Sequence, residues 1–431
     1  MTEREAGGAP RSPPGGGTPA PGGAAGPHGV LLGLDRILLS PESFPEITGS
    51  GSRPGNPRAR RVGLVTSDAS PSALRALGRP PARSALLDAG VPLTRLFTPE
   101  HGLSGRASDG TAVEDGRDQV SGLPVTSLYG PRLTPSDGLL GEVDLMLFDL
   151  QDVGARFYTY LWTLSHLMES CAEAGIPIWV LDRPNPLGGL PEWVEGPLPD
   201  PGAPPTFLGR WPVPIRHSLT LGEMAGLLRE EMGLAVELRV VTVEGWERAS
   251  QWPATGLAFH PPSPGIPTFE SALLYPGLAF LEATNAREGR GTEMSFRWFG
   301  APWMASVEAA AAVNEAGFPG VLAHPWDMGQ EGDACPGVRL EVTDPGTLRP
   351  VALGLRLLSL LGTLWPDGFR WSSYPTAANP GGRDHLLRLT GSAETVRLLE
   401  ESPREVTAAR VAELTRAPGW WERATPHLLY R

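Results

Sequence analysis

The chain has 431 residues, of which 41% are apolar, so it is long enough to bury a sizeable core and to form two domains. Its formal net charge of −12 argues against a nucleic-acid partner, because proteins normally bind nucleic acids through a basic surface. The sequence contains no lysine, which excludes a Walker A loop, a pyridoxal-phosphate Schiff base and a lysine aldolase, since each requires an amine.

Residues 1–29 differ in composition from the rest of the chain. They are mostly Gly, Pro, Ala and Ser with scarcely any large apolar side chain, which predicts a disordered tail. No basic start is followed by an apolar run of signal-peptide length, and no stretch approaches the length of a membrane span. We therefore expect a cytoplasmic protein with no membrane partner. Cys171 and Cys335 lie far apart in the sequence, so we expect neither a disulfide framework nor a cysteine metal site.

Five short apolar runs then follow one another along the chain. Their cores show little alternation, and helix-like or Gly/Pro-rich connections flank them, as is typical of strands buried on both faces of a parallel sheet. An apolar stripe from Leu161 to Met168 predicts a crossover helix that ends at Gly175. The sequence therefore predicts an α/β fold with a doubly wound parallel sheet. The five runs cover residues 61–66, 93–97, 123–128, 143–150 and 177–181.

Polar, titratable or aromatic residues directly follow each of the five runs. Because the carboxyl ends of parallel strands meet at one edge of a doubly wound sheet, we expect these side chains to converge there. A carboxylate beside an imidazole at a strand end, as in Glu100-His101, is typical of the place where an α/β enzyme carries out its chemistry. This edge is the predicted active site. Its candidate residues are Asp68, Glu100, His101, Tyr129, Asp152 and Asp182.

A connection rich in Pro and Gly over residues 182–216 separates these runs from the elements that follow. Thr220 and Glu223 have the spacing of a capping box and predict a helix that ends near Met232. Alternating apolar residues predict a strand over residues 236–243. A second region begins near Gln251, with a helix near residues 307–316, a strand over residues 337–342 and an apolar helix over residues 353–364.

Several segments of the chain occur in the order found in one enzyme family. They read FTPEHGLSG, GLPVTSLYG, FDLQDVGARFYTY, VLDRPNPLGG, VEGP, PIRHSLTLGE, ALLYPGLAFLEATNAREGRGT, FGAPW and HLLYR. Over roughly residues 61–431 the chain thus resembles the NamZ-type exo-β-N-acetylmuramidases, glycosidases that release terminal N-acetylmuramic acid from peptidoglycan fragments. The resemblance implies a Rossmann-like domain, which we expect over residues 30–250, a smaller α/β domain over residues 251–431, and a substrate cleft between them.

The resemblance also implies a small-molecule substrate, either a muramyl disaccharide or a muropeptide fragment. The chain departs from the family pattern at one turn. Family members usually carry TN-x-TG after the first strand, whereas this chain reads Thr66-Ser67-Asp68-Ala69-Ser70. Because Asn offers a sugar both donors and an acceptor, we expect the contacts with the substrate at this position to differ.

Glu100 is the predicted general acid. Hydrolysis of a glycosidic bond requires a proton on the leaving oxygen, and a carboxyl group half-buried at a strand end can hold that proton near neutrality. The structural alternative is that Glu100 caps the following turn. Glu288 or Glu282 is the predicted second carboxylate, in preference to Asp152, because the glycines that flank Arg290 allow this segment to approach the cleft closely. The structural alternative for Glu288 and Glu282 is an ion pair between the two domains.

The predicted substrate-binding residues combine aromatic, polar and cationic side chains. Sugars are bound by aromatic faces and bidentate polar groups, and the lactyl carboxylate of N-acetylmuramic acid matches the fork of an arginine. Arg156, Arg183 and Arg290 are the candidates for that carboxylate, with structural salt bridges as the alternative. The full set is His101, Tyr129, Asp152, Arg156, Tyr158, Asp182, Arg183, Asn185, His217 and Arg290.

Neither a metal nor an organic cofactor is predicted. No H-E-x-x-H or similarly tight ligand spacing is present, and the first apolar run is followed by Ser-Asp-Ala-Ser and not by a G-x-G-x-x-G turn. Two other functions stay open. The altered turn at Ser67-Asp68 is compatible with a non-catalytic protein that binds muramyl sugars. A zinc-dependent amidase that cleaves the bond between sugar and peptide could draw its ligands from His101, Asp182 and His217.

Overall fold

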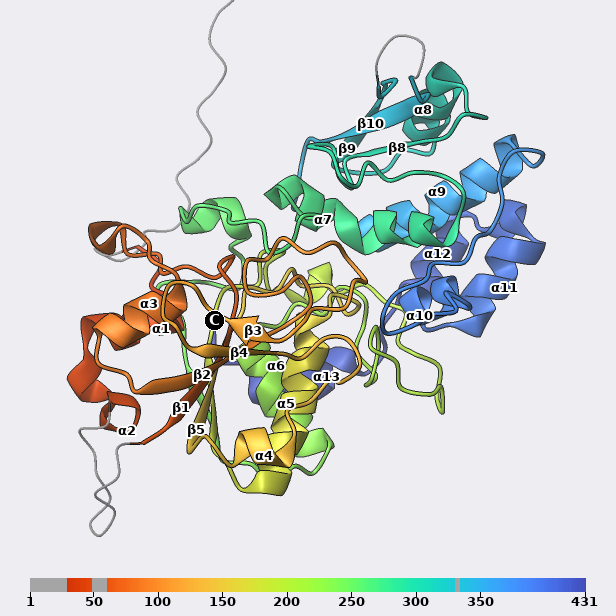
Figure 1. Cartoon of the computed structure of the whole chain (residues 1–431). Helices are drawn as coiled ribbons and strands as arrows, with labels where there is room; N and C mark the ends of the chain where they lie inside the picture. The colour runs from red at the N-terminus through yellow and green to blue at the C-terminus, as the bar shows by residue number, and fades with distance from the viewer. Residues whose placement is uncertain (1–28, 49–59, 330–333) are drawn as a thin grey trace, which may run out of the picture.

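The computed structural model describes residues 29–48, 60–329 and 334–431, so the predicted tail lies almost wholly outside the described residues. A seven-stranded sheet forms the centre of the larger part of the molecule (Figure 1). Its order is β3-β4-β2-β1-β5-β6-β7, and only β3 is antiparallel to its neighbour. The strands are β1 (Val62–Thr66), β2 (Leu93–Thr98), β3 (Gly116–Arg117), β4 (Pro124–Ser127), β5 (Leu145–Asp149), β6 (Ile178–Leu181) and β7 (Leu238–Val241).

The six parallel strands have the order of a doubly wound sheet, in which the chain moves outward from β1 first in one direction and then in the other. Each of the five predicted runs coincides with one of these strands to within two residues at either end, and the run predicted over residues 236–243 contains β7. The predicted fold class is confirmed. The two-residue strand β3 was not predicted, because it is too short to show any periodicity.

Apolar side chains cover both faces of the sheet, which explains the lack of alternation in the sequence. On β5, Leu145 and Leu147 belong to one apolar cluster together with α1 (Gly33–Leu39) and α3 (Ala82–Asp88). Met146 and Phe148 belong to a second cluster together with α5 (Tyr160–Ala174) and α6 (Leu221–Glu231). Since successive residues of a strand point to opposite faces, a strand covered on both faces needs an unbroken apolar run.

The second sheet is smaller and antiparallel, with the order β8-β10-β9. Figure 1 shows it at the end of the molecule away from the large sheet, with α7 and α9 lying between the two. Its strands are β8 (Trp298–Gly300), β9 (Val321–Pro325) and β10 (Gly337–Val342). The remaining helices are α2 (Pro45–Thr48), α4 (Asp137–Leu140), α7 (Phe269–Leu278), α8 (Ser306–Glu315), α9 (Pro350–Leu364), α10 (His385–Thr390), α11 (Ala393–Glu401), α12 (Ala408–Leu414) and α13 (Trp420–Ala424).

None of the helices in the described ranges is both long and apolar enough to cross a membrane. The predicted strand over residues 337–342 and the predicted helices near residues 307–316 and 353–364 correspond to β10, α8 and α9. The boundary expected near residue 250 stays a prediction.

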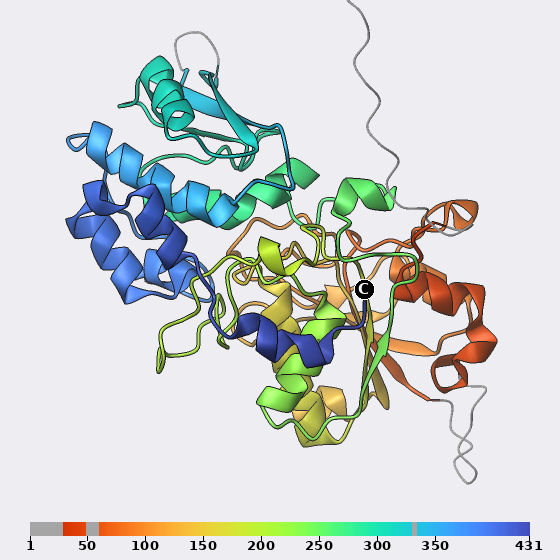
Figure 2. The ribbon, with the colours of Figure 1, turned by 180° about the vertical axis from the view of Figure 1, so that it is seen from behind.

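The C-terminal segment returns to the larger part of the molecule. Figure 2 shows α13 and the residues after it, coloured dark blue, running across that part from behind. Trp420 Nε1 donates a hydrogen bond to the backbone oxygen of His217 at 3.0 Å, and the Tyr430 hydroxyl donates to Asp182. The Tyr430 hydroxyl also accepts a hydrogen bond from the N–H of Val243 at 3.0 Å, so the last residues hold the segments that follow β6 and β7.

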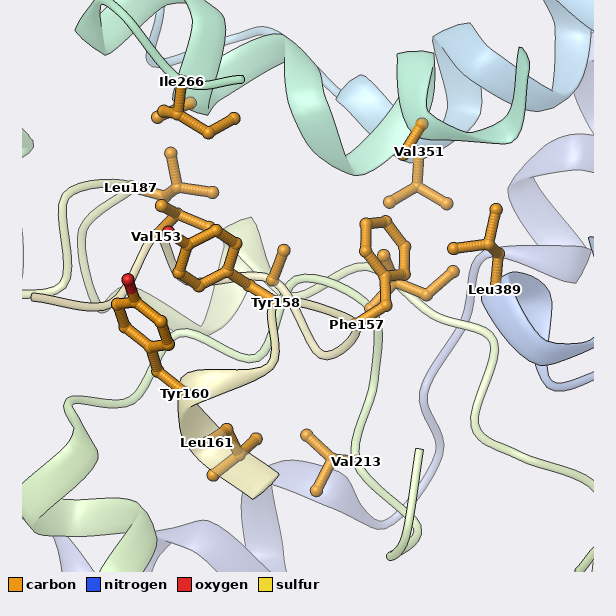
Figure 3. Close-up of a cluster of buried hydrophobic side chains, with 14 of the residues drawn as sticks. Val153, Phe157, Tyr158, Tyr160, Leu161, Leu187, Val213, Ile266, Val351 and Leu389 are labelled. Atoms are coloured by element: carbon orange, nitrogen blue, oxygen red, sulfur yellow. The ribbon is translucent and has the colours of Figure 1, made fainter. Parts of the chain in front are cut away.

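A buried segment between β5 and α5 joins the two parts of the structure. All residues from 151 to 165 are buried. Figure 3 shows Phe157 and Tyr158 pointing toward Ile266 and Val351, which come from the second region of the chain. The Phe157 ring also lies edge-on to the Tyr275 ring of α7, with 5.2 Å between their centres. This packing explains why the FDLQDVGARFYTY segment is so rich in aromatic and apolar side chains.

Helices α7 and α9 cross at two glycines, which gives a test of the packing. A Cβ atom on Gly354 would lie 2.2 Å from the backbone oxygen of Gly277. We expect Gly354→Ala to lower the free energy of unfolding by about 1–3 kcal/mol, the usual cost of overpacking. Gly362→Ala in the same helix is the control, because its Cβ would make only ordinary contacts, the nearest at 3.6 Å to the Phe369 ring, and it should be neutral or stabilising. Urea denaturation measures both variants, and equal stabilities would contradict this account of the crossing.

Candidate active site

A cavity lies where the carboxyl edge of the large sheet meets the second region of the chain. It encloses about 740 Å³ of free space, its open mouth included, which is in the range of small-molecule sites. One wall of the cavity is formed by the loops after β2 and β4 and by the residues at the start of α5. The other wall is formed by α7, by the segment that follows α7 and by a C-terminal loop. The lining residues with polar or aromatic side chains include Glu100, His101, Asp109, Tyr129, Tyr158, Thr159, Tyr275, Glu282, Arg290, Phe296, Tyr374, Thr376, Asn379, His385 and Arg388.

Glu100 comes directly after β2, and its side chain is held by two neutral donors. The backbone N–H of Gly110 donates to Oε1 at 2.6 Å, and the Thr159 hydroxyl donates to Oε2 at 2.8 Å. Glu100 is 6% exposed. Both of its oxygens are thus fixed in direction without contact with a cation.

His101 shapes the loop that carries the first of these donors. It has a φ of +71°, and the following Gly102 has a φ of +73°, so the chain turns sharply after Glu100. The His101 ring nitrogen Nδ1 lies 2.9 Å from the backbone oxygen of Ala107, and the Ala107 N–H donates to the backbone oxygen of His101 at 3.1 Å. These contacts fold the loop back so that Gly110 reaches Glu100.

Gly110 also connects this loop to the second region. Its backbone oxygen accepts a hydrogen bond from the N–H of Ala377 at 2.7 Å. Gly110 has a φ of +67°, and a Cβ atom there would lie 2.9 Å from Thr376 Cγ2, so only glycine fits without strain. The position of the Glu100 carboxylate therefore depends on contacts across the cavity.

Arg290 is the centre of a cluster of charges on the opposite wall. Its guanidinium donates to Asp109 Oδ2 at 2.6 Å, and it also donates to Glu282 and to the Tyr374 hydroxyl. Its Nε lies 3.3 Å from Glu288 Oε1. Despite burial, the surrounding carboxylates raise the pKa of Arg290 well above its usual range.

The two glutamates of this cluster have opposite electrostatic environments. Burial opposes ionisation of Glu282, but Arg290 and His385, whose Nε2 lies 2.7 Å from Glu282 Oε2, outweigh it and lower the pKa of Glu282. Burial raises the pKa of Glu288 in spite of the nearby Arg290. Glu282 is therefore held ionised, whereas Glu288, which does not line the cavity directly, takes up a proton more readily.

Tyrosine hydroxyls provide neutral donors near Glu100. Burial and the Glu100 carboxylate raise the pKa of Tyr129 well above its usual range, and burial likewise raises the pKa of Tyr158. The Tyr160 hydroxyl donates to the backbone oxygen of Pro262 at 2.9 Å, so this residue fixes a loop on the far wall. Tyr129 and Tyr158 line the cavity, as the sequence predicted for sugar-binding residues.

Two of the three arginines proposed for the lactyl carboxylate lie outside the cavity. The Arg156 guanidinium is fully buried and donates to the backbone oxygens of Pro197, Val213 and Leu389 at 2.6–2.9 Å. Arg183 pairs with the buried Asp149 at 2.7 Å. Both guanidinium groups are thus held by acceptors within the protein.

The remaining predicted residues form a network beneath the cavity and do not line it. Asp182 accepts hydrogen bonds from the Thr220 hydroxyl at 2.7 Å and from the Gly222 N–H at 2.8 Å. Asn185 Nδ2 donates to the backbone oxygen of Leu219 at 2.9 Å. The buried His217 lies next to Asp152, with Nε2 3.6 Å from Oδ2. These contacts hold together the loops that follow β5, β6 and the connection to α6.

The altered turn after β1 also lies outside the cavity. Asp68 forms an ion pair with Arg83, which in turn pairs with Asp118 at 2.8 Å. The N–H of Asp68 donates to the backbone oxygen of Leu103 at 2.7 Å. The residues that replace the family's Asn turn therefore support the loop after Glu100. Within the described ranges, no three His, Cys, Asp or Glu side chains are grouped so that they could hold a metal ion.

Several polar residues of the cavity were not predicted from the sequence, among them Asp109, Tyr374, His385 and Arg388. Asp109 lies in the same loop as Glu100, but its Ser-Asp-Gly surroundings resemble an ordinary turn. The other three, Tyr374, His385 and Arg388, lie beyond the last predicted strand, where no strand-end pattern points to a site. Only the fold brings them to Glu282 and Arg290.

Comparison with known proteins identifies the family. The model described as "Exo-beta-N-acetylmuramidase NamZ, N-terminal" matches residues 62–270, and the corresponding C-terminal model matches residues 273–430. The chain belongs to the NamZ family of exo-β-N-acetylmuramidases. The peptidoglycan beta-N-acetylmuramidase NamZ of Bacillus subtilis (strain 168) is 38% identical over 349 residues, which is 80% of each chain. The resemblance read from the sequence is thereby confirmed.

Two solved structures have the same fold. Both are DUF1343 family proteins of Bacteroides fragilis NCTC 9343, and each comparison covers 93% of this chain and 99% of the other. The first is 26% identical with a TM-score of 0.76, and the second is 24% identical with a TM-score of 0.62. The two NamZ family models meet within α7, and the cavity is lined by residues from both of the family's halves.

The lowered pKa of Glu282 predicts how stability depends on pH. Because its folded-state pKa is lowered, ionised Glu282 stabilises the fold above the unfolded-state pKa of about 4.3, and this contribution is lost as pH falls through the folded-state value. We expect Glu282→Gln to lower the free energy of unfolding at pH 7 by about 1.5–3 kcal/mol, as for a hydrogen bond to a charged group. The difference should shrink only as the pH falls below about 4.3 toward the folded-state pKa.

Urea denaturation at several pH values measures this difference. Glu400→Gln is the control, because Glu400 is an exposed glutamate of α11 and its substitution should change stability little at any pH. A difference between wild type and Glu282→Gln that stays constant, or grows, as the pH is lowered would contradict the assignment of an ionised Glu282.

Proposed function

We propose that the protein is an exo-acting glycoside hydrolase that releases terminal N-acetylmuramic acid from peptidoglycan-derived fragments. The observation that carries the proposal is the position of Glu100, a buried carboxyl group at a strand end, in a cavity that also holds the carboxylates around Arg290. Membership of the NamZ family supports the substrate class. A cytoplasmic location, expected from the sequence, stays a prediction.

Glycoside hydrolysis uses two carboxyl groups with different tasks. We assign to Glu100 the transfer of a proton to the leaving oxygen, because hydrogen bonds from the Gly110 N–H and the Thr159 hydroxyl fix the direction of its carboxyl group at the cavity wall. The second carboxyl group comes from the Arg290 cluster. Ionised Glu282 suits stabilisation of the positive charge that develops on the sugar, and Glu288 and Asp109 are the other members bound by the same guanidinium.

The cavity also fits the steps before and after proton transfer. Its two walls come from different parts of the chain, so a bound sugar is shielded from water on both sides. The side chains of Tyr129, Tyr158 and Phe296 line the cavity and make part of its wall apolar, which suits contact with the carbon atoms of the pyranose ring. The hydroxyl groups of Tyr129 and Thr159 and the amide of Asn379 supply donors and acceptors for its substituents.

The other two functions considered from the sequence receive no support from the described residues. Asp68, in the altered turn that suggested a binding protein, pairs with Arg83 away from the cavity. Of the ligands considered for a zinc amidase, Asp182 and His217 are bound into the loop network below the cavity, whereas His101 lines it.

Glu100→Gln tests the assignment of the proton donor. Glutamine keeps the shape and can still accept the Gly110 hydrogen bond, but it has no transferable proton. We expect kcat for a muramide with a poor leaving group to fall by about 10²–10⁴, the usual contribution of general acid–base catalysis. The melting temperature should stay close to that of the wild type.

Glu114→Gln is the matched control, because Glu114 is exposed in the same loop and should retain full activity. The loss should be smaller on a substrate whose leaving group needs no proton, such as a nitrophenolate. Near wild-type turnover of the poor substrate by Glu100→Gln would refute the assignment.

A further inference from the structure

The cavity contains two arginines among its described lining residues, and their surroundings differ. Arg290 is already surrounded by negative charge, since it is bonded to Asp109 and Glu282 and lies 3.3 Å from Glu288. A substrate anion at Arg290 would have to displace one of these carboxylates or be repelled by them. Arg290 is therefore bound into the carboxylate cluster that organises the cavity, and these carboxylates oppose the approach of an anionic ligand.

Arg388 is a cation without a partner among the described residues. It is partly exposed on α10 and lines the cavity, and no described side chain or backbone oxygen accepts a hydrogen bond from its guanidinium. Its Nε is buried and unpaired. A buried donor without an acceptor costs free energy that a bound acceptor would restore. The Arg388 guanidinium is therefore free to bind an anionic group of a ligand.

The position of Arg388 is fixed by contacts on both sides of it in the sequence. His385, one helical turn earlier, is bound to Glu282 at 2.7 Å. The backbone oxygen of Leu389 accepts a hydrogen bond at 2.6 Å from Arg156, which itself is fully buried. Arg156 therefore acts as a positioning residue that holds α10 against the first half of the protein. These contacts fix the backbone of α10 from which the Arg388 side chain reaches the cavity wall.

We propose that Arg388 binds the lactyl carboxylate of N-acetylmuramic acid. The proposal rests on the proposed function and deepens it. The lactyl group is what distinguishes this sugar from N-acetylglucosamine, and a planar guanidinium matches a carboxylate through two parallel hydrogen bonds. Because Glu100, Asp109 and Glu282 also line the cavity, an anionic substrate requires a cation that these carboxylates have not already neutralised. Arg388 meets this requirement.

The test compares a chromogenic N-acetylmuramide with the same compound carrying a methyl ester on its lactyl carboxylate. For the wild type we expect esterification to lower kcat/KM by about 10- to 100-fold, mainly through KM, as for the loss of a hydrogen bond to a charged group. Arg388→Met should lower kcat/KM for the free acid by a similar factor and should hydrolyse acid and ester at nearly equal rates. Arg388→Lys, which keeps the charge but not the fork, should lie between the two.

Arg383→Met is the control, because it removes an exposed arginine that precedes the same helix and does not line the cavity, and it should retain the wild-type ratio of acid to ester. Melting temperatures establish that each variant is folded. An Arg388→Met variant that still prefers the acid as strongly as the wild type does would overturn the proposal. So would a wild type that hydrolyses acid and ester equally. If the wild type hydrolysed neither compound nor any other muramide, the proposed function itself would fail.

Discussion

The ion pairs of Arg290 are the interaction on which the geometry of the cavity depends. One guanidinium binds Asp109, from the loop after β2, and Glu282, from the segment after α7, so it joins the two halves of the family's fold at the site itself. Carboxylates in partly buried surroundings repel one another strongly unless a cation lies between them. With Arg290 in place they can line a single cavity, and Tyr374 and His385 complete their hydrogen bonds.

This arrangement gives the carboxyl groups of the cavity different chemical characters. Glu282 is bound by an arginine and a histidine and is held ionised, whereas Glu100 is contacted by uncharged groups, namely the Gly110 N–H and the hydroxyls of Thr159 and Tyr129. Enzymes that use two carboxyl groups separate their tasks in this way, through the environment of each group. The loop between residues 101 and 110 contributes to both environments, since it carries Asp109 to Arg290 and Gly110 to Glu100.

The sequence predicted most of the large sheet because each parallel strand, buried on both faces, must be an apolar run. It also predicted that Glu100, His101 and Tyr129 lie near one another, since residues that follow parallel strands meet at one edge. The same rule does not say whether a side chain points into a cavity or is bound inside the protein. Arg156 is an example, because its backbone acceptors lie as far away in the sequence as Leu389.

The residues that the sequence did not reveal reach the cavity through contacts between distant loops. Asp109 is brought to Arg290 by a loop that is anchored through Gly110 to Ala377. Arg388 and His385 depend on α10, a helix of six residues that shows no strand-end pattern and is held by Arg156. Such positions follow from tertiary packing, and local propensity or periodicity carries no information about them.

The most direct measurement of the central claim is the product released from two isomeric disaccharides. One has N-acetylmuramic acid at its non-reducing end and N-acetylglucosamine at the other, and the second has the reverse order. Chromatography with mass detection follows both. We predict release of free N-acetylmuramic acid from the first disaccharide and no cleavage of the second. Cleavage of both at similar rates, or of neither, would contradict the assignment of the cavity as the site of an exo-acting muramidase.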